Sequence, residues 1–190
     1  MNAALHPGRR LLSVEDYHRM GEAGILAPDE RVELIDGEII AMSPIGRMHR
    51  GLVNHLTRLL IEAVGTRAIV QVQSSIRLSD RSEPEPDVAL LCPRADFYKR
   101  AVPGPTDVLL LIEVSDSTLT HDRDTKVPLY AKAAVPEVWI VDVRGERLVT
   151  YREPVEHGYS RELALRPVET LELAALADVT IDLSELFGDA

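Results

Sequence analysis

The stretch LLLIEVSDSTLTHDRDTK, residues 109–126, decides the fold of this chain. It opens with an uninterrupted apolar run, which is typical of a central strand that is covered on both faces. Glu113 then places a carboxylate near the end of that strand. Because an unpaired buried carboxylate is costly, the group must find a partner or become neutral. The stretch therefore predicts a central strand with a chemical site at its end.

Lys126 closes this stretch, and a helix with several alanines near its end follows. Proline is tolerated in the first turn of a helix, where its missing N–H is not needed. Pro128 therefore predicts a helix that starts near Thr125, with Lys126 at its mouth. A helix that starts earlier would instead be kinked by Pro128. In either case the loop is long enough to return Lys126 over the end of the strand.

A second carboxylate stands at the start of another strand, in EPEPDVALL, residues 83–91. Two prolines precede Asp87 and keep the chain extended as it enters the strand expected over 86–92. Hard cations such as Mg²⁺ take oxygen ligands, often one or two carboxylates. A bound metal activates water and polarises a phosphoryl oxygen, and a nearby lysine offsets developing charge. Asp87, Glu113 and Lys126 together indicate a metal-dependent phosphodiesterase.

The segment RVELIDGEIIAM, residues 31–42, predicts a hairpin with Asp36 and Gly37 as its two-residue turn. This turn places Glu33 opposite Ile40. Side chains of a strand alternate between its two faces. The face expected to lie against the core is the wholly apolar one, which consists of Val32, Leu34, Ile39 and Ala41. Glu33 is expected on the opposite, mixed face.

Helical spacing of apolar residues from Met48 to Val64 predicts a helix over 47–64, with Gly65 as its C-cap. On another face Arg47, Arg50 and Arg58 form a stripe. Such a stripe could contact phosphates, although a charged helix face is usually only solvated. Ser13 predicts the start of a short N-terminal helix. Further strands are expected over 67–73, 107–114, 137–143 and 147–152, and a weak strand and a short helix near the C-terminus.

The chain has 190 residues, of which 45% are hydrophobic and 27% charged, as in an ordinary globular protein. We expect a single α/β (α+β) domain over 1–190, with a mixed sheet and packed helices. It would comprise a helix and hairpin over about 11–42, a core over about 43–152 and an acidic segment over 153–190.

The net charge of −10 is unusual for a nucleic-acid-binding chain. Cys92 is the single cysteine, so no internal disulfide can form, which favours a reducing compartment. The N-terminus lacks the apolar core of a signal peptide, and no apolar run is long enough for a membrane helix. These features lead us to expect a cytoplasmic protein without a membrane partner.

Pro86-Asp87 followed by IEVS, residues 112–115, resembles the PD-(D/E)XK nuclease superfamily. More specifically, RVELIDGEI, EPDVALL and the long segment IEVSDSTLTHDRDTKVPLYAKAAVPEVWIVD together resemble the bacterial Uma-two family of restriction-endonuclease-like proteins. The resemblance covers roughly residues 11–152. It implies a restriction-endonuclease-like core, a central mixed β-sheet flanked by helices. It also implies a homodimer, for which the apolar residues of 137–152 could supply the interface.

The resemblance implies that Asp87 and Glu113 bind Mg²⁺ or Mn²⁺. The backbone carbonyl of Val114 would be a further ligand, and Glu33 matches an extra carboxylate of the family near the site. The superfamily usually has its catalytic lysine two residues after the glutamate. Here that position is Ser115, and the resemblance assigns the lysine to Lys126 on the following helix.

Two more polar residues are candidate substrate contacts. His49 stands near the start of the 47–64 helix, where the family has a histidine. Gln73 alternates with Gln71 on a strand beside the expected site. Polar residues of this kind are more often caps or packing residues than ligands, and both roles stay open at this point.

These observations lead us to expect a metal-dependent endonuclease that hydrolyses phosphodiester bonds of nucleic acid, with DNA as the expected substrate. A catalytically inactive binding or scaffold protein of the same fold is one alternative, which the acidic composition and Ser115 favour. A metal-dependent hydrolase of a small phosphorylated substrate is another, which an enclosed pocket would favour.

Overall fold

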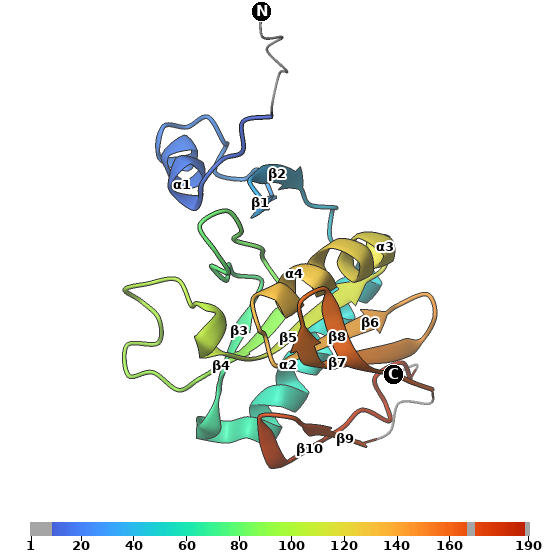
Figure 1. The fold of residues 1–190 in the computed structure, drawn as a ribbon. Coiled ribbons are helices and arrows are strands. Elements are labelled where there is room, and N and C mark those ends of the chain that lie inside the picture. Colours follow the sequence, from blue (N-terminus) through green and yellow to red (C-terminus); the bar gives the residue numbers. More distant parts are fainter. Residues whose placement is uncertain (1–8, 167–169, 189–190) are drawn as a thin grey trace, which may run out of the picture.

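A six-stranded mixed sheet forms the centre of the protein, for which a computed structural model describes residues 9–166 and 170–188. The strand order is β3-β4-β5-β6-β7-β8 (Figure 1). The β5–β6 pair is parallel and the other pairs are antiparallel. This confirms the α/β class with a central mixed sheet. The strands are β3 (Ile69–Val72), β4 (Val88–Leu91), β5 (Val108–Ser115), β6 (Glu137–Asp142), β7 (Arg147–Val155) and β8 (Gly158–Leu165).

Helices cover both faces of this sheet. One face packs against α2 (Arg47–Val64), which ends at Gly65 as predicted. The other face packs against the helical segment between β5 and β6. A crossover of this kind is required because β5 and β6 run parallel. Short 3₁₀ turns, η1 (Gly65–Arg67) and η2 (Pro105–Asp107), lead into β3 and β5. The apolar run of β5 is therefore covered on both sides, as its sequence predicts.

The helix after β5 starts earlier than predicted. It comprises α3 (Leu119–His121), a π-helical turn η3 (Asp122–Lys126) and α4 (Val127–Lys132), without a break. In the π turn the N–H of Val127 donates to the carbonyl of Asp122, five residues back. Pro128 has no N–H, and its ring would clash with the carbonyl four residues earlier in a regular α-helix. The wider turn directly before Pro128 accommodates it, so Lys126 lies inside the helical segment and not at its mouth.

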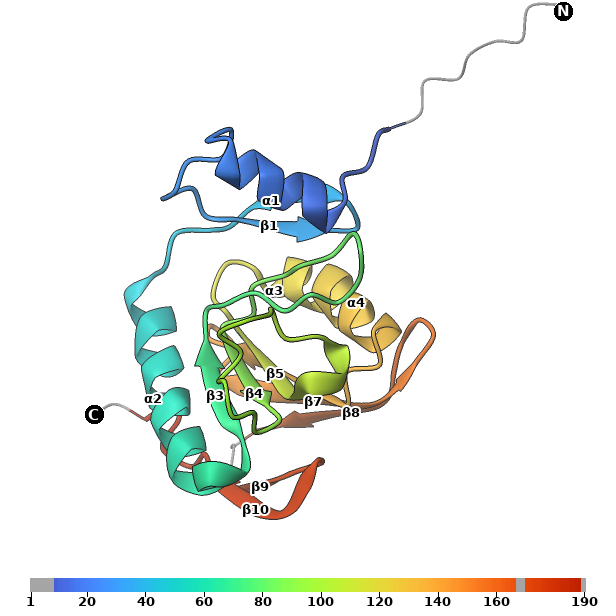
Figure 2. The same ribbon diagram turned by 90° about the vertical axis from the view of Figure 1, so that its left-hand side faces the viewer.

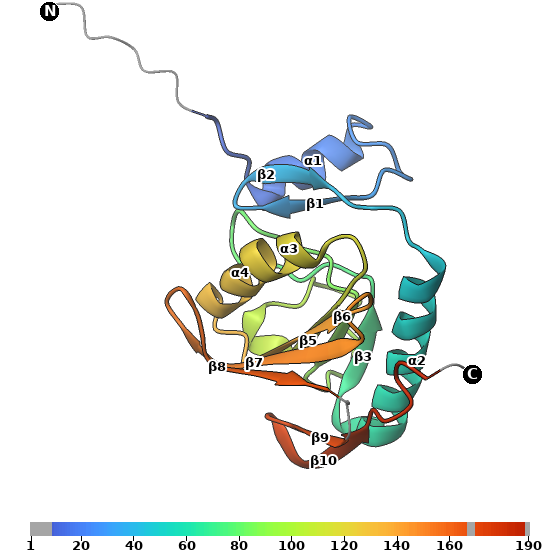
Figure 3. The ribbon, with the colours of Figure 1, turned by 90° about the vertical axis from the view of Figure 1, so that its right-hand side faces the viewer.

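The N-terminal region forms a small layer of its own, in which α1 (Val14–Glu22) lies over the hairpin of β1 (Val32–Ile35) and β2 (Glu38–Ala41). Ser13 caps α1 in a reciprocal capping box with Asp16. The hairpin has the predicted register, with Glu33 opposite Ile40. Figures 2 and 3 show the hairpin between α1 on one side and α3 and α4 on the other.

The predicted core face of this hairpin is only partly right. Leu34 is buried, but Ala41 is exposed. On the opposite face, Ile35 is buried and packs with Ile40 into the core beside α4. Because the hairpin lies between two layers, both of its faces are covered. The mixed face, which carries Glu33, is the one turned towards the main sheet.

The C-terminal region contains more sheet than its sequence indicated. β8 pairs with β7, and β9 (Thr170–Leu173) pairs with β10 (Leu176–Asp182) in a separate hairpin beside α2. Leu171 and Ile181 of that hairpin belong to the same apolar core as α2. The short helix expected near the C-terminus is a turn in the described residues.

Two further expectations are wrong. The apolar residues of 137–152 are buried inside the chain, because β6 lies between β5 and β7 and helices cover the sheet. They therefore cannot supply a dimer interface. Met48, which the apolar spacing placed on the packed side of α2, is 66% exposed. Among the described residues, no helix has the length and hydropathy that crossing a membrane requires.

Candidate active site

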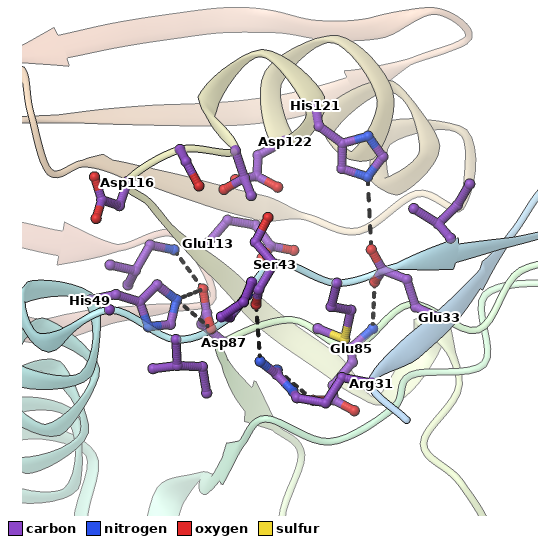
Figure 4. A pocket seen from close by; sticks show the side chains of 18 of the residues that line it. Arg31, Glu33, Ser43, His49, Glu85, Asp87, Glu113, Asp116, His121 and Asp122 are labelled. Atoms are coloured by element: carbon purple, nitrogen blue, oxygen red, sulfur yellow. Dashed lines mark hydrogen bonds and ion pairs between the residues drawn. The ribbon is translucent and has the colours of Figure 1, made fainter. Parts of the chain in front are cut away.

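A cavity of about 370 Å³ lies where the hairpin, the start of α2, α3 and the ends of β4 and β5 meet (Figure 4). Three separate parts of the sequence, residues 31–49, 85–87 and 113–126, thus line one space. Most of the residues predicted for the site contribute to its lining, namely Glu33, His49, Asp87, Glu113, Val114 and Lys126. Gln73 is not in the lining, but its side-chain amide contacts one of these residues, Asp87, at 3.3 Å.

The two principal carboxylates are brought together by strand register. β4 and β5 are antiparallel, with Val88 opposite Ile112. Extending this register by one residue places Asp87 opposite Glu113, and directly opposed side chains on one face of a sheet lie within contact range. The N–H of Val114 donates to Asp87 Oδ2 at 2.9 Å.

Asp87 is held in place by neighbours on three elements. His49 Nε2, from the first turn of α2, lies 3.0 Å from its carboxylate. Gln73, which follows β3, contacts it from another side. Together with the backbone N–H of Val114, these contacts fix the orientation of the carboxylate. His49 and Gln73 therefore contact a predicted metal ligand, whereas the sequence suggested contacts to substrate.

Glu113 is 3% exposed and has two close partners. Lys126 Nζ lies 2.9 Å from Glu113 Oε1, and the Tyr130 hydroxyl donates to the same oxygen at 2.5 Å. Burial raises the pKa of Glu113 to about 8, the Lys126 ammonium opposes this rise, and nearby carboxylates add to it. The charged form of Glu113 thus depends on nearby positive charge. The carboxylate that the sequence places near the end of a buried strand therefore has a cation, Lys126, as its partner.

Lys126 joins Glu113 to the hairpin. Its ammonium also lies 3.1 Å from Glu33 Oε2, which accepts the backbone N–H of Glu85 at 3.0 Å. Burial acts to lower the pKa of Lys126, but the carboxylates of Glu113 and Glu33 raise it above its ordinary value. Burial acts to raise the pKa of Glu33, but His121 and Lys126 lower it. Lys126 is therefore a fixed cation between two carboxylates.

Ser115 occupies the position of the superfamily lysine and has a different role. It lies on the same face of β5 as Glu113, two residues on, and is fully buried. Its hydroxyl donates to Asp122 Oδ2 at 2.7 Å, and Thr118 donates to the same oxygen at 2.6 Å. The amine that lies beside Glu113 belongs instead to Lys126, on the helical segment that covers this face.

Sequence reasoning missed Asp122 and Tyr130 as parts of the site. Asp122 is buried, and its carboxylate accepts the hydroxyl of Ser115. The two residues stand four positions before and after Lys126. Residues four apart lie on one face of a helix, so their spacing carried a signal that the assumed late helix start concealed.

The carboxylates that lie together at the cavity are too few for a site made wholly of protein ligands, but they fit a magnesium or manganese ion that keeps several waters. Among the described residues no group of three or more His, Cys, Asp or Glu side chains could hold a metal ion. Mg²⁺ does not need such a group, because it is commonly bound through one or two carboxylates, waters and substrate phosphates. Asp87 and Glu113 on one cavity wall match that requirement. Glu33 is instead engaged by Lys126.

The side of the cavity at the start of α2, which adjoins Asp87, has features that suit an anion. Gly46 and His49 of the α2 start line it, and the first turn of α2 has no side-chain cap and no acidic residue. Free N–H groups and the helix dipole favour phosphate at such an end. In addition, His49 Nδ1 and His121 Nε2 are buried without a hydrogen-bond partner in the described structure. These nitrogens could bind a phosphate oxygen or an ordered water.

The comparisons with known proteins show the family and the fold of the chain. A family model described as "Putative restriction endonuclease" matches residues 14–184. A crystal structure of "a putative nuclease belonging to DUF820" from Anabaena variabilis has the same fold, with a TM-score of 0.69 and 13% identity over 93% of this chain and 97% of that one. Curated proteins gave no match. The match over most of its length shows that the chain belongs to the Uma2 family, a family described as restriction-endonuclease-like and thus nuclease-like.

Proposed function

We propose that the protein is a Mg²⁺- or Mn²⁺-dependent endonuclease that cleaves phosphodiester bonds of nucleic acid, with DNA as the foremost substrate. One observation carries this proposal. Asp87 and Glu113 stand opposite each other at one cavity wall, and the amine of Lys126 lies 2.9 Å from Glu113. The uncapped start of α2, which adjoins Asp87 at the same cavity, would supply a place for a phosphate. Membership of the Uma2 family supports the same assignment.

Asp87, Glu113 and the carbonyl of Val114 would hold the metal, with Glu33 as an additional ligand if Lys126 moves. When bound, the ion would polarise a phosphoryl oxygen and lower the pKa of a bound water. His49 and Gln73 orient the carboxylate of Asp87. The ordering of ligands by such neighbours commonly contributes 10–100-fold to metal affinity or activity.

Lys126 would orient the attacking water and offset charge on the phosphate. It can do so because the carboxylates around it keep it protonated. It is therefore suited to donating hydrogen bonds and unsuited to being a general base. The wall formed by the hairpin limits access of bulk water to this group, since Lys126 is 3% exposed.

A second function has one specific observation in its favour. The cavity volume of about 370 Å³ lies within the range of small-molecule sites. A metal-dependent hydrolase of a small phosphorylated substrate would use the same residues. The homodimer that the family resemblance implies is compatible with either function, although its interface cannot consist of the buried apolar residues of 137–152.

Calorimetric titration with Mn²⁺, followed by cleavage assays on plasmid DNA, tests the proposal. We expect wild-type protein to bind Mn²⁺ and Asp87→Asn to bind it at least tenfold more weakly. Asp80→Asn is the matched control, because Asp80 is exposed and distant from the cavity lining. Absence of Mn²⁺ binding by folded wild-type protein at millimolar concentration would overturn metal dependence. Cleavage of a small phosphodiester without cleavage of plasmid would favour the second function.

A further inference from the structure

The outward face of α2 carries three arginines, Arg47, Arg50 and Arg58, at helical spacing. All three are exposed, and in the described part of the chain none makes an ion pair. Glu62 is the one acidic residue of α2; it stands one turn after Arg58, and the described structure has no ion pair between the two. The chain as a whole has a net charge of −10. Three unpaired arginines on one helix face of an acidic protein form a local cationic surface, and clustered cations on one face are the electrostatic footprint that nucleic-acid binding requires.

Gly51 lies in the middle of this face. Apart from proline, glycine is the least favourable residue in the interior of a helix. A Cβ added at Gly51 would meet nothing within 4 Å, so packing inside the chain does not require glycine there. The residue stands four positions after Arg47, directly after Arg50 and three before Asn54. A glycine among cationic side chains allows the backbone of a ligand to come close to the helix.

This face starts at the edge of the cavity. Gly46 and His49, in the first turn of α2, line the cavity, and Arg47 lies between them. At a rise of 1.5 Å per residue, the face extends about 17 Å from Arg47 to Arg58. One strand of duplex DNA carries a charge every 3.4 Å along the axis. The face is thus long enough to follow about five phosphates that lead away from the cavity.

We propose that the α2 face formed by Arg47, Arg50, Gly51, Asn54 and Arg58 binds the sugar–phosphate backbone of the nucleic-acid substrate and leads it into the cavity. This inference rests on the proposed function, and it assigns a polymer and not a small phosphate ester as the substrate class. Contacts to phosphates position a nucleic acid without reading its bases. Binding along this face is therefore independent of sequence and sensitive to salt.

Fluorescence anisotropy with labelled duplex and single-stranded DNA tests this inference, with EDTA present so that binding is measured without cleavage. We expect each of Arg47→Gln, Arg50→Gln and Arg58→Gln to weaken binding several-fold. Each should also reduce the slope of log K against log salt by about 0.9 on duplex, or about 0.7 on single strands. Arg100→Gln, at an exposed arginine of the β4–β5 loop, is the matched control. The DNA form that wild-type protein binds with the lower Kd at equal salt is the preferred substrate.

Gly51→Ala gives a test in which stability and binding change in opposite directions. We expect a higher melting temperature, because alanine favours the helix, together with several-fold weaker DNA binding. A raised melting temperature with unchanged binding would show that the face is merely solvated and would overturn the inference. So would a triple arginine variant with the salt slope of Arg100→Gln, or wild-type protein that binds neither DNA form.

The two proposals fail in different ways. If the salt slope depends on the arginines but Mn²⁺ neither binds nor supports cleavage, the α2 face stands and the catalytic assignment falls. If Mn²⁺-dependent cleavage of plasmid DNA is present but the triple arginine variant binds and cleaves like wild type, the catalytic assignment stands and the α2 face falls.

Discussion

The two faces of β5 are built on different principles. Ile112 and Val114 turn towards α2 and join an apolar core. Their neighbours Glu113 and Ser115 turn towards the helical segment of α3 and α4, where they meet Lys126 and Asp122. An apolar face is stabilised by shape and tolerates substitutions of equal volume. A buried polar face is stable only while each charge has its partner. One strand thus combines a face that tolerates substitutions with a face that does not.

The largest effect is expected from Lys126→Met on the polar face. It would leave the buried carboxylates of Glu113 and Glu33 without their cation. Breaking a buried pair in this way costs about 3–5 kcal/mol of unfolding free energy, which urea denaturation would measure. Lys132→Met, at an exposed lysine of the same helix, should change little. Equal stability of the two variants would show that the polar face does not depend on its cation.

The next largest effect is expected on the apolar face, from Leu56→Ala in α2. Leu56 is fully buried, so the lost methyl groups leave a cavity and cost about 2–5 kcal/mol. Leu56→Met keeps the volume and should cost less than about 1.5 kcal/mol. Denaturation of both variants measures the difference. If Leu56→Met proved as costly as Leu56→Ala, the apolar face of β5 and the α2 residues packed on it would be as intolerant of substitution as the polar face.

Tyr130→Phe removes a single hydrogen bond from the polar face. The Tyr130 hydroxyl donates to Glu113, so its loss leaves a buried acceptor with one partner fewer and should cost about 1–3 kcal/mol. Tyr159→Phe is the matched comparison, because its hydroxyl donates to the neutral carbonyl of Val135 and its loss should cost about 0.5–1.5 kcal/mol. Burial raises the pKa of Glu113 to about 8, so the comparison is made by urea denaturation above that pH. The reverse order there would mean that the charge of Glu113 contributes nothing to this bond.

The smallest effect is expected outside both faces, at the capping box of α1. Hydrogen bonds from the Ser13 backbone and side chain lower the pKa of Asp16 below 3.8. The contribution of Asp16 is therefore present above its ordinary pKa and is lost as the pH falls through the lowered value. We expect Asp16→Ala to melt slightly lower than wild type at pH 7, with the gap closing below pH 3.8. Glu22→Ala is the control, and a gap that persists at low pH would contradict the assignment.

Local rules predicted much of this fold. The Asp36-Gly37 turn gave the hairpin register because such a turn allows one pairing of its strands. The bounds of α2 followed from apolar spacing and Gly65. Asp87 and Glu113 could be paired because each stood where an apolar strand begins or ends.

Other features depend on tertiary structure and could not be predicted in this way. Pro128 indicates a helix start by local rules, but a π turn directly before it accommodates the proline inside a longer helical segment. Which hairpin face meets the body depends on where α1 lies, and the register does not contain that information. β8 is exposed along most of its length, so its sequence lacks the apolar alternation that reveals a half-buried strand.

The π turn at Asp122–Lys126 also sets the phase between two parts of one helical segment. A regular α-helix turns by about 100° per residue. The wide turn offsets α3 from α4, so that His121 approaches Glu33 at 3.8 Å while Tyr130 reaches Glu113. Regular α-helical winding over the same number of residues would rotate one part by about 100° relative to the other. The wide turn, and not any single side chain of α3 or α4, therefore determines which residues of the segment face the site.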